Sequence, residues 1–116
     1  MAYVDGFLIP VKKTNKDAYT KMAKMAAKIW KDSGALEVVE CWGDDVPEGK
    51  VTSFPMAVKL EEDETVVFSW VTWPDRQSRD AGNEKVMADP RMQINADMPF
   101  DGKRLIFGGF EVISKI

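Results

Sequence analysis

The sequence has no histidine among its 116 residues. Histidine is the side chain whose unperturbed charge changes between about pH 5 and 8, and it is the commonest metal ligand in proteins. Its absence excludes Ser-His-Asp and Cys-His catalytic sets, and it excludes His-ligated metal sites built within one chain. Any chemistry must therefore use carboxylates, lysine, tyrosine, the one thiol, backbone groups or a bound cofactor.

Cysteine and long apolar runs are also scarce. Cys41 is the only cysteine, so one chain can form neither an intramolecular disulfide nor a cysteine-based zinc site, and a reducing compartment is compatible. No run of about 18 apolar residues would cross a bilayer. Residues 1–5 lack the basic segment and apolar run of a secretory signal. We therefore expect a cytoplasmic protein with no membrane partner.

The sequence also lacks a strong positive charge, since 16 basic and 19 acidic residues give a formal net charge of -3. Binding of nucleic acid requires a concentrated basic surface that neutralises phosphates, so we expect no nucleic-acid partner. The length fits one domain, residues 1–116, with enough chain to bury a core.

What the sequence does contain is a run of β-branched and aromatic side chains at residues 65–73, bounded by an acidic turn and by Pro74. Such residues favour a pleated sheet. Alternation would place Val66, Phe68, Trp70 and Thr72 on one face of this strand, and Val67, Ser69, Val71 and Trp73 on the other. Because both faces are largely apolar, we expect both to be covered.

The other elements follow from periodicity and turn residues. Further strands are expected at residues 3–9, 36–43, 52–60 and 104–113. A first helix is expected after a capping box that begins at Thr14, and Gly34 should be its left-handed stop. A second helix should run from an Asp75 cap to about residue 88. A short third helix is expected from Asp89 to about residue 98.

This order of elements predicts the fold class α+β, with a ferredoxin-like antiparallel sheet and its helices on one face. The uncovered face of residues 65–73 would leave a larger apolar patch than monomers usually tolerate. We therefore expect two chains to place these faces together as a dimeric α+β barrel. Such a homodimer would bury about 2,000 Å² or more in total.

Polar residues at core-facing positions define a candidate site. If Val86 faces the sheet, Arg79, Gly82 and Asn83 lie on the same side of the second helix. Arg and Asn beside a glycine indicate a polar-lined gap, although Arg79 paired with a structural carboxylate would give the same pattern. Asp5 is unusual in a strand, so it either lies at a sheet end or is held by a partner, and an edge or turn position is its commoner role. The candidate ligand-binding residues are Asp5, Trp70, Arg79, Asn83 and Arg104.

These residues would line a pocket for a small organic molecule between the helices and the sheet. Arg79 or Arg104 would orient an anionic or carbonyl group, and Asp5 would act as a base. Tryptophan rings, Trp42 and Trp73 among them, would stack a planar ligand, although core packing is their commoner role. We assign no catalytic residue and expect no metal site.

Short motifs occur in order along nearly the whole chain: YVDGF at 3–7, VECW at 39–42, DDVP at 44–47, VFSW at 67–70, RDA at 79–81, NEK at 83–85, DPRM at 89–92 and MPFDGKR at 98–104. Together they resemble the YbaA-like family of uncharacterised bacterial proteins. The resemblance implies the dimeric α/β-barrel superfamily, which also contains cofactorless monooxygenases, haem-degrading enzymes and lactone isomerases. It implies no reaction, because a fold does not fix function.

Two functions remain open. The first is a homodimer that binds or transforms a small organic molecule, in its most specific form a cofactorless oxidoreductase or monooxygenase acting on an electron-rich aromatic substrate. We expect no cofactor, and haem is disfavoured because its axial ligand would have to be Tyr, Cys or Met. The second is a noncatalytic dimeric module for interaction or stress response. A metabolite that stabilises the protein would distinguish them.

Overall fold

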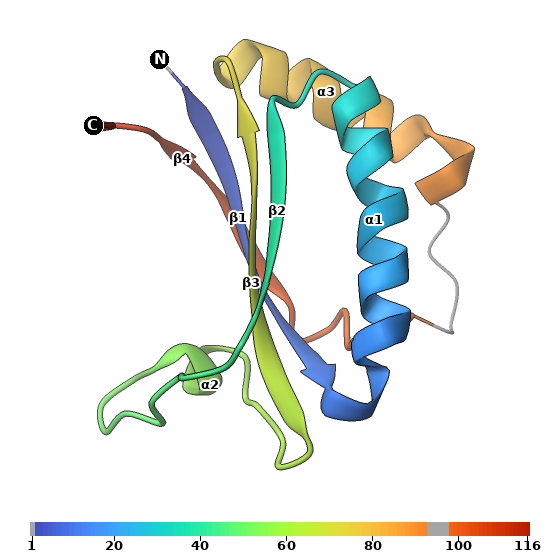
Figure 1. The fold of residues 1–116 in the computed structure, drawn as a ribbon. Coiled ribbons are helices and arrows are strands. Elements are labelled where there is room, and N and C mark those ends of the chain that lie inside the picture. Colours follow the sequence, from blue (N-terminus) through green and yellow to red (C-terminus); the bar gives the residue numbers. More distant parts are fainter. Residues whose placement is uncertain (1, 93–97) are drawn as a thin grey trace.

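The computed structural model describes residues 2–92 and 98–116 and shows an α+β protein built on one antiparallel sheet (Figure 1). The elements are β1 (Tyr3–Lys12), α1 (Lys16–Asp32), β2 (Glu37–Trp42), α2 (Phe54–Ala57), β3 (Glu64–Trp73), α3 (Arg76–Ala88) and β4 (Ile106–Glu111), with 3₁₀ turns at Lys13–Asn15 and Pro90–Met92. The strand order is β2-β3-β1-β4, so the two longest strands form the centre of the sheet.

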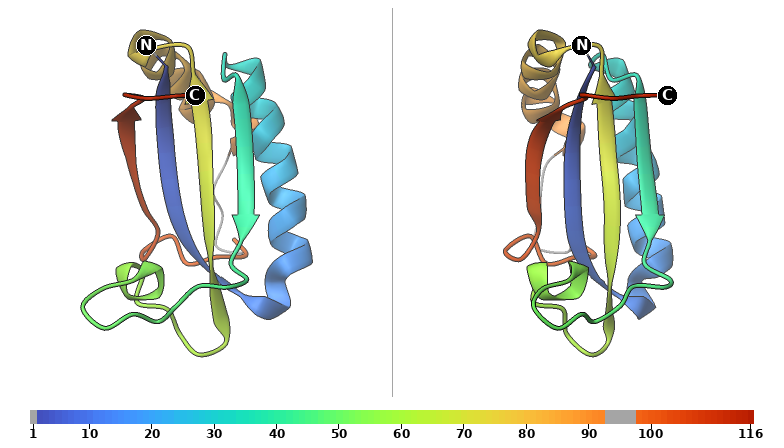
Figure 2. Two further views of the ribbon diagram at one scale, coloured as in Figure 1. Left: turned by 60° about the vertical axis from the view of Figure 1, so that its left-hand side comes forward. Right: turned by 90° about the vertical axis from the view of Figure 1, so that its left-hand side faces the viewer.

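The two longer helices, α1 and α3, cover one face of the sheet, and we call this the helix face. The opposite side, the open face, is turned toward the viewer in the right-hand view of Figure 2, where the short α2 segment lies in front of one end and the C-terminal segment after β4 crosses in front of the other. Among the described residues, no helix has the length and apolar character needed to cross a bilayer.

Register decides which side chains lie on each face. Asp5 pairs with Val71 and Gly6 pairs with Trp70, so the two faces alternate along both central strands. The buried core lies on the helix face in two clusters, with Ile9, Val11, Tyr19, Ala23 and Val67 in one and Tyr3, Ala35, Val71 and Trp73 in the other. The face predicted to carry Val67, Ser69, Val71 and Trp73 is therefore the one that the helices bury.

The helix ends agree with only part of their sequence signals. The Asp75 side chain caps α3 by accepting from the Ser78 amide at 2.7 Å. Gly34 has a φ of 111° after α1, a left-handed conformation that glycine adopts without steric cost. The capping box at Thr14 is wrong, because Thr14 lies inside a 3₁₀ turn and the N-cap position falls on Asn15 without a side-chain cap.

The strand expected at residues 52–60 is wrong as well. Residues 54–57 form α2, in which Ser53 caps the first turn by accepting from the Met56 amide at 3.1 Å and Pro55 lies in the first turn. Local capping and a proline with a fixed φ favour this short helix over an extended segment. As a result β3 pairs with β2 and β1 directly, without an additional strand.

The C-terminal elements are shorter than expected. The last strand begins at Ile106, because Arg104 turns away to bind carboxylates before the strand starts. Its Gly108 and Gly109 keep regular pairing with β1, and a Cβ at Gly109 would lie 2.5 Å from the Tyr3 hydroxyl. The short third helix is represented by the 3₁₀ turn at Pro90–Met92, and the rest of that prediction lies outside the described residues.

Candidate functional site

Two of the predicted site residues form a buried ion pair on the helix face. Asp5 on β1 is 4 % exposed, and the Arg79 guanidinium on α3 reaches both carboxylate oxygens, with Nη2 2.8 Å from Oδ1 and Nε 3.2 Å from Oδ2. The Trp73 indole also donates to Oδ2 at 3.0 Å. Asp5 is therefore held by partners in a central strand, and the edge or turn position is wrong.

Arg79 is fixed by further neighbours. Its Nη1 lies 2.9 Å from Asp80, and its guanidinium carbon lies 5.1 Å from the centroid of the Tyr3 ring. The hydrogen bonds to Asp5 are the main reason that the pKa of Arg79 is raised above its ordinary value. This geometry agrees with the alternative in which Arg79 pairs with a structural carboxylate.

Asn83 lies one helical turn beyond Arg79 on α3, and its Oδ1 is buried without a hydrogen bond from the described residues. The neighbouring Gly82 does not mark a gap. A Cβ at this position would overlap the Trp73 ring and lie 2.9 Å from the Ser33 carbonyl oxygen. The polar-lined gap expected here is therefore wrong, because the indole fills the space.

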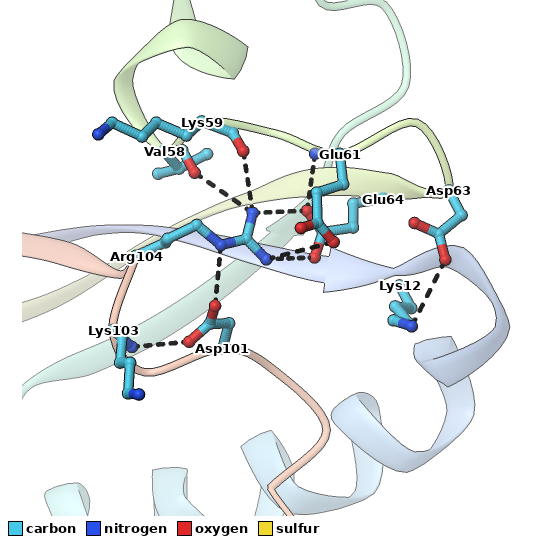
Figure 3. A network of polar contacts seen from close by, with 9 residues as sticks. All are labelled: Lys12, Val58, Lys59, Glu61, Asp63, Glu64, Asp101, Lys103 and Arg104. Carbon is cyan, nitrogen blue, oxygen red and sulfur yellow. Dashed lines mark hydrogen bonds and ion pairs between the residues drawn. The ribbon is translucent and has the colours of Figure 1, made fainter.

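Arg104 belongs to a second network at the other end of the sheet (Figure 3). Its Nη1 and Nη2 each lie 2.7 Å from an oxygen of Glu64, and its Nε donates to Asp101 at 2.8 Å. The Lys59 carbonyl accepts from Nη1 at 3.0 Å. These bonds attach the segment before β4 to the start of β3.

The charges in this network stabilise one another. Glu64 is 5 % exposed, and its hydrogen bonds to Arg104 lower its pKa below the ordinary value of 4.5 despite the opposing effect of burial. The pKa of Arg104 is raised chiefly by the same contact. Arg104 therefore has the bonding of a structural clamp within this chain.

Trp70 lies on the open face, on the opposite side of the sheet from Asp5. Its indole donates to Glu37 at 3.2 Å, and its ring centroid lies 5.4 Å from that of Phe68. The five predicted residues thus occupy three places: the Asp5–Arg79 centre with Asn83 nearby, the Arg104 clamp and the open face. The structure does not bring them together around one pocket, and a ligand role for them stays a prediction.

A different hollow does lie between a helix and the sheet. It has a volume of about 290 Å³ and opens between α1 and the edge strand β2, and we call it the α1–β2 groove. Its lining includes Lys16, Tyr19, Ala23, Lys24, Ala27, Val38, Glu40, Trp42 and Val67. Ala23 and Ala27 leave space because their methyl groups, four residues apart, lie on the same side of the helix. The groove is therefore largely apolar, with a few charged groups.

The most distinctive contact in the groove joins Tyr19 to Glu40. The phenol hydroxyl donates to Glu40 Oε1 at 2.6 Å, a short bond of the kind formed with a charged acceptor. Desolvation raises the pKa of Tyr19, and it also raises the pKa of Glu40 above 4.5. A raised pKa means that folding favours the protonated carboxyl over the charged form.

Trp42 and Lys16 complete the groove. Trp42 is half-buried at the end of β2, and the Lys16 ammonium lies 5.5 Å from the centroid of its ring. Trp42 was among the rings considered as stacking surfaces, but Tyr19 and Glu40 were missed as site residues. The sequence did contain a signal for Glu40, because this acidic residue lies between the apolar Val38 and Trp42 on one face of a predicted strand.

Comparisons with known proteins identify the family of this chain, but they assign no activity to it. Residues 2–102 match the family model DUF1428, described as a protein of unknown function. The chain is 59 % identical over 114 residues to the uncharacterised protein YbaA of Escherichia coli strain K12, and the match covers 97 % of each chain. The uncharacterised protein YbaA of Shigella flexneri gives the same values.

Proposed function

Because the chain belongs to the DUF1428 family of unknown function, in which its relatives are uncharacterised YbaA proteins, we propose a function from its own geometry. The protein binds a small organic molecule in the α1–β2 groove and works as a homodimer. This keeps the predicted pocket between helix and sheet, but its lining differs from the five residues selected from the sequence.

The observation that carries the proposal is the Tyr19–Glu40 contact at 2.6 Å inside a hollow of about 290 Å³. A carboxyl with an unfavourable shift in pKa, placed in an apolar groove, is a feature that folding alone does not require. The volume of the groove is close to the lower limit of known ligand pockets, which begin at about 300 Å³. A few polar groups among apolar side chains are typical of such sites.

The homodimer is supported by the open face. Phe68 and Phe110 on this face are 44 % and 60 % exposed, and Ile106 beside them is 44 % exposed. The strand order β2-β3-β1-β4 with two helices on one side supports the predicted ferredoxin-like arrangement. A second copy would cover these side chains and form the dimeric barrel, since an apolar patch of this kind marks an interaction site.

An oxidoreductase without a cofactor is the most specific form of the proposal. In this form Glu40 would accept a proton from a bound hydroquinone, and its raised pKa would make it a better base than an ordinary carboxylate. The hydroquinone would lose two electrons and two protons to O₂ and give the quinone and hydrogen peroxide. Hydrogen peroxide formed in equal amount to quinone, measured in solution, is the signature of this reaction.

A noncatalytic dimeric module is the second candidate, and one observation favours it. Arg79, Arg104, Asp5 and Glu64 are all committed to ion pairs within the chain. These charged groups therefore lack the open bonding positions of a catalytic set. This candidate predicts that dimerisation occurs and that the α1–β2 groove takes no ligand.

Occupation of the groove can be tested with a groove-filling variant. Ala27→Leu adds an apolar side chain to the groove wall and preserves helix propensity, so it should reduce the affinity of any groove ligand at least about tenfold. Compounds that raise the Tm of the wild-type protein in a metabolite screen should lose that effect in the variant. Isothermal titration calorimetry then gives the change in Kd.

Ala18→Leu is the matched control, because Ala18 is an exposed residue of α1 outside the groove lining. It should bind every compound like the wild type. If a compound binds Ala27→Leu as tightly as it binds the wild-type protein, the groove is not its binding site. A screen that yields no stabilising compound would favour the noncatalytic module.

A further inference from the structure

We propose that the ligand of the α1–β2 groove is a planar aromatic alcohol of the phenol class, with its hydroxyl donating to Glu40 and its ring lying among Trp42 and the apolar wall. The inference rests on the proposed function and goes one step further, because it names the class of ligand that the groove selects whether or not that ligand is then oxidised.

Glu40 supplies the polar end of the site. Its Oε1 already accepts a phenol hydroxyl, that of Tyr19, at 2.6 Å. Its Oε2 has no hydrogen-bond donor among the described residues, and Glu40 is an exposed residue of the groove lining, so a ligand can reach this oxygen. A carboxylate has about four acceptor positions, so a second hydroxyl can bind beside the first. The Tyr19 contact is thus an internal example of the bond that a phenol ligand would make.

The apolar wall fits a flat body. Val38, Val67, Ala23 and Ala27 line the groove together with the Trp42 ring. An apolar cavity of about 150 Å³ already holds benzene. The groove volume of about 290 Å³ therefore admits a compound of one or two fused rings.

The charges select against other ligand classes. Glu40 would repel the carboxylate of an organic acid bound beside it, while Lys16 and Lys24 in the same lining would repel an organic cation. A neutral ring with a hydrogen-bond donor meets neither penalty. The same two lysines would stabilise negative charge that develops on a phenol oxygen as its proton moves toward Glu40.

Three bicyclic probes of similar size test the inference by calorimetry: 2-naphthol, 2-methoxynaphthalene and 2-naphthoate. The wild-type protein should bind 2-naphthol at least about tenfold more tightly than the methyl ether, which lacks the donor, since this is the factor expected for a hydrogen bond to a charged group. The carboxylate should bind more weakly than 2-naphthol as well. Equal affinity for 2-naphthol and its methyl ether would overturn the phenol class.

Two substitutions assign the preference to Glu40. Glu40→Leu removes the acceptor and should abolish the preference for 2-naphthol, whereas Glu84→Leu on α3, outside the groove, should retain it. Tyr19→Phe removes the donor that competes for the Glu40 charge, which makes both carboxylate oxygens stronger acceptors, and should tighten 2-naphthol about threefold or more. If Glu40→Leu does not fold, Tyr19→Phe decides alone, and an unchanged Kd in that variant would contradict a bond to Glu40.

The outcomes separate this inference from the proposed function. If the methyl ether or the carboxylate binds as tightly as 2-naphthol and Ala27→Leu weakens all three, the groove is a ligand site but the phenol class is wrong. If none of the three probes binds, the phenol class is overturned. If the metabolite screen then also gives no compound sensitive to Ala27→Leu, the proposed function fails with it.

Discussion

Charged side chains of this protein differ in how completely they are bonded. Arg79 and Arg104 each reach both oxygens of a buried carboxylate, and every nitrogen of each guanidinium has an acceptor. Among the residues that the structure describes, Glu40 instead receives one donor, from Tyr19. Complete bonding makes a residue a structural clamp, because any ligand would first have to break those bonds. Glu40, which is less completely bonded than the two arginines and their carboxylates, is therefore the better candidate for binding a ligand.

We predict that Glu64→Gln destabilises the protein by about 2 kcal/mol at neutral pH, because the charge-assisted bonds of Arg104 to a nearly buried carboxylate are weakened. Chemical denaturation followed by tryptophan fluorescence measures this loss. Lys12→Ala is the matched control, since Lys12 and Asp63 form an exposed pair at 3.6 Å in the same region (Figure 3) and such pairs contribute little.

The same variant gives a prediction about pH. Glu64 has a pKa below 4.5 in the folded protein, so its contribution is present above the unfolded value and is lost as pH falls through the folded pKa. The difference in unfolding free energy between wild type and Glu64→Gln should therefore stay constant near neutral pH and shrink below about pH 4.5. A difference that is unchanged from neutral pH down through that range would show that Glu64 is not the linked group.

Helix α3 illustrates how packing overrides local preference. By helix propensity alone, Gly82→Ala should stabilise α3 by roughly 1 kcal/mol. The structure reverses the sign, because the new methyl group would overlap the Trp73 ring, which is fully buried between α3 and the sheet. The close approach of helix and indole therefore requires glycine here.

We predict that Gly82→Ala destabilises the protein by about 1–3 kcal/mol, the usual cost of overpacking a core. A lower denaturation midpoint with a changed Trp73 environment in near-UV circular dichroism would confirm it. Glu84→Ala, an exposed position on the same helix, should leave the midpoint nearly unchanged. Stabilisation by Gly82→Ala would show that α3 can move away from the ring without penalty.

At the scale of the molecule, the proposed homodimer has its interface on the open face. We predict that the 13.1 kDa chain is a dimer at micromolar concentration and that Phe110→Glu converts it to a folded monomer. The reason is that two copies of a negative charge would enter one apolar interface without partners. Light scattering coupled to size exclusion measures the mass, and circular dichroism checks the fold.

Met87→Glu is the control for this experiment, because Met87 is 79 % exposed on α3 and lies away from the open face. It should remain a dimer. A wild-type protein that is monomeric throughout the micromolar range would contradict both the homodimer and the barrel. Loss of the dimer in Met87→Glu but not in Phe110→Glu would place the interface on the helix side.

The sequence by itself determined those elements whose signals lie within a few neighbouring residues. The alternation at residues 65–73 identified β3, and Asp75 and Gly34 marked the helix ends, because these signals act over a few positions. The absence of histidine excluded whole classes of site before any fold was known.

Only the tertiary structure decided which side chains meet. Asp5 and Arg79 are 74 positions apart, and Tyr19 and Glu40 are 21 apart, so no local pattern reports either contact. Strand pairing placed Trp70 on the face opposite Asp5, and the packing of α1 against β2 created the groove that contains Glu40. The periodicity of the sequence predicts the fold class, whereas the site depends on strand register and on packing between distant segments.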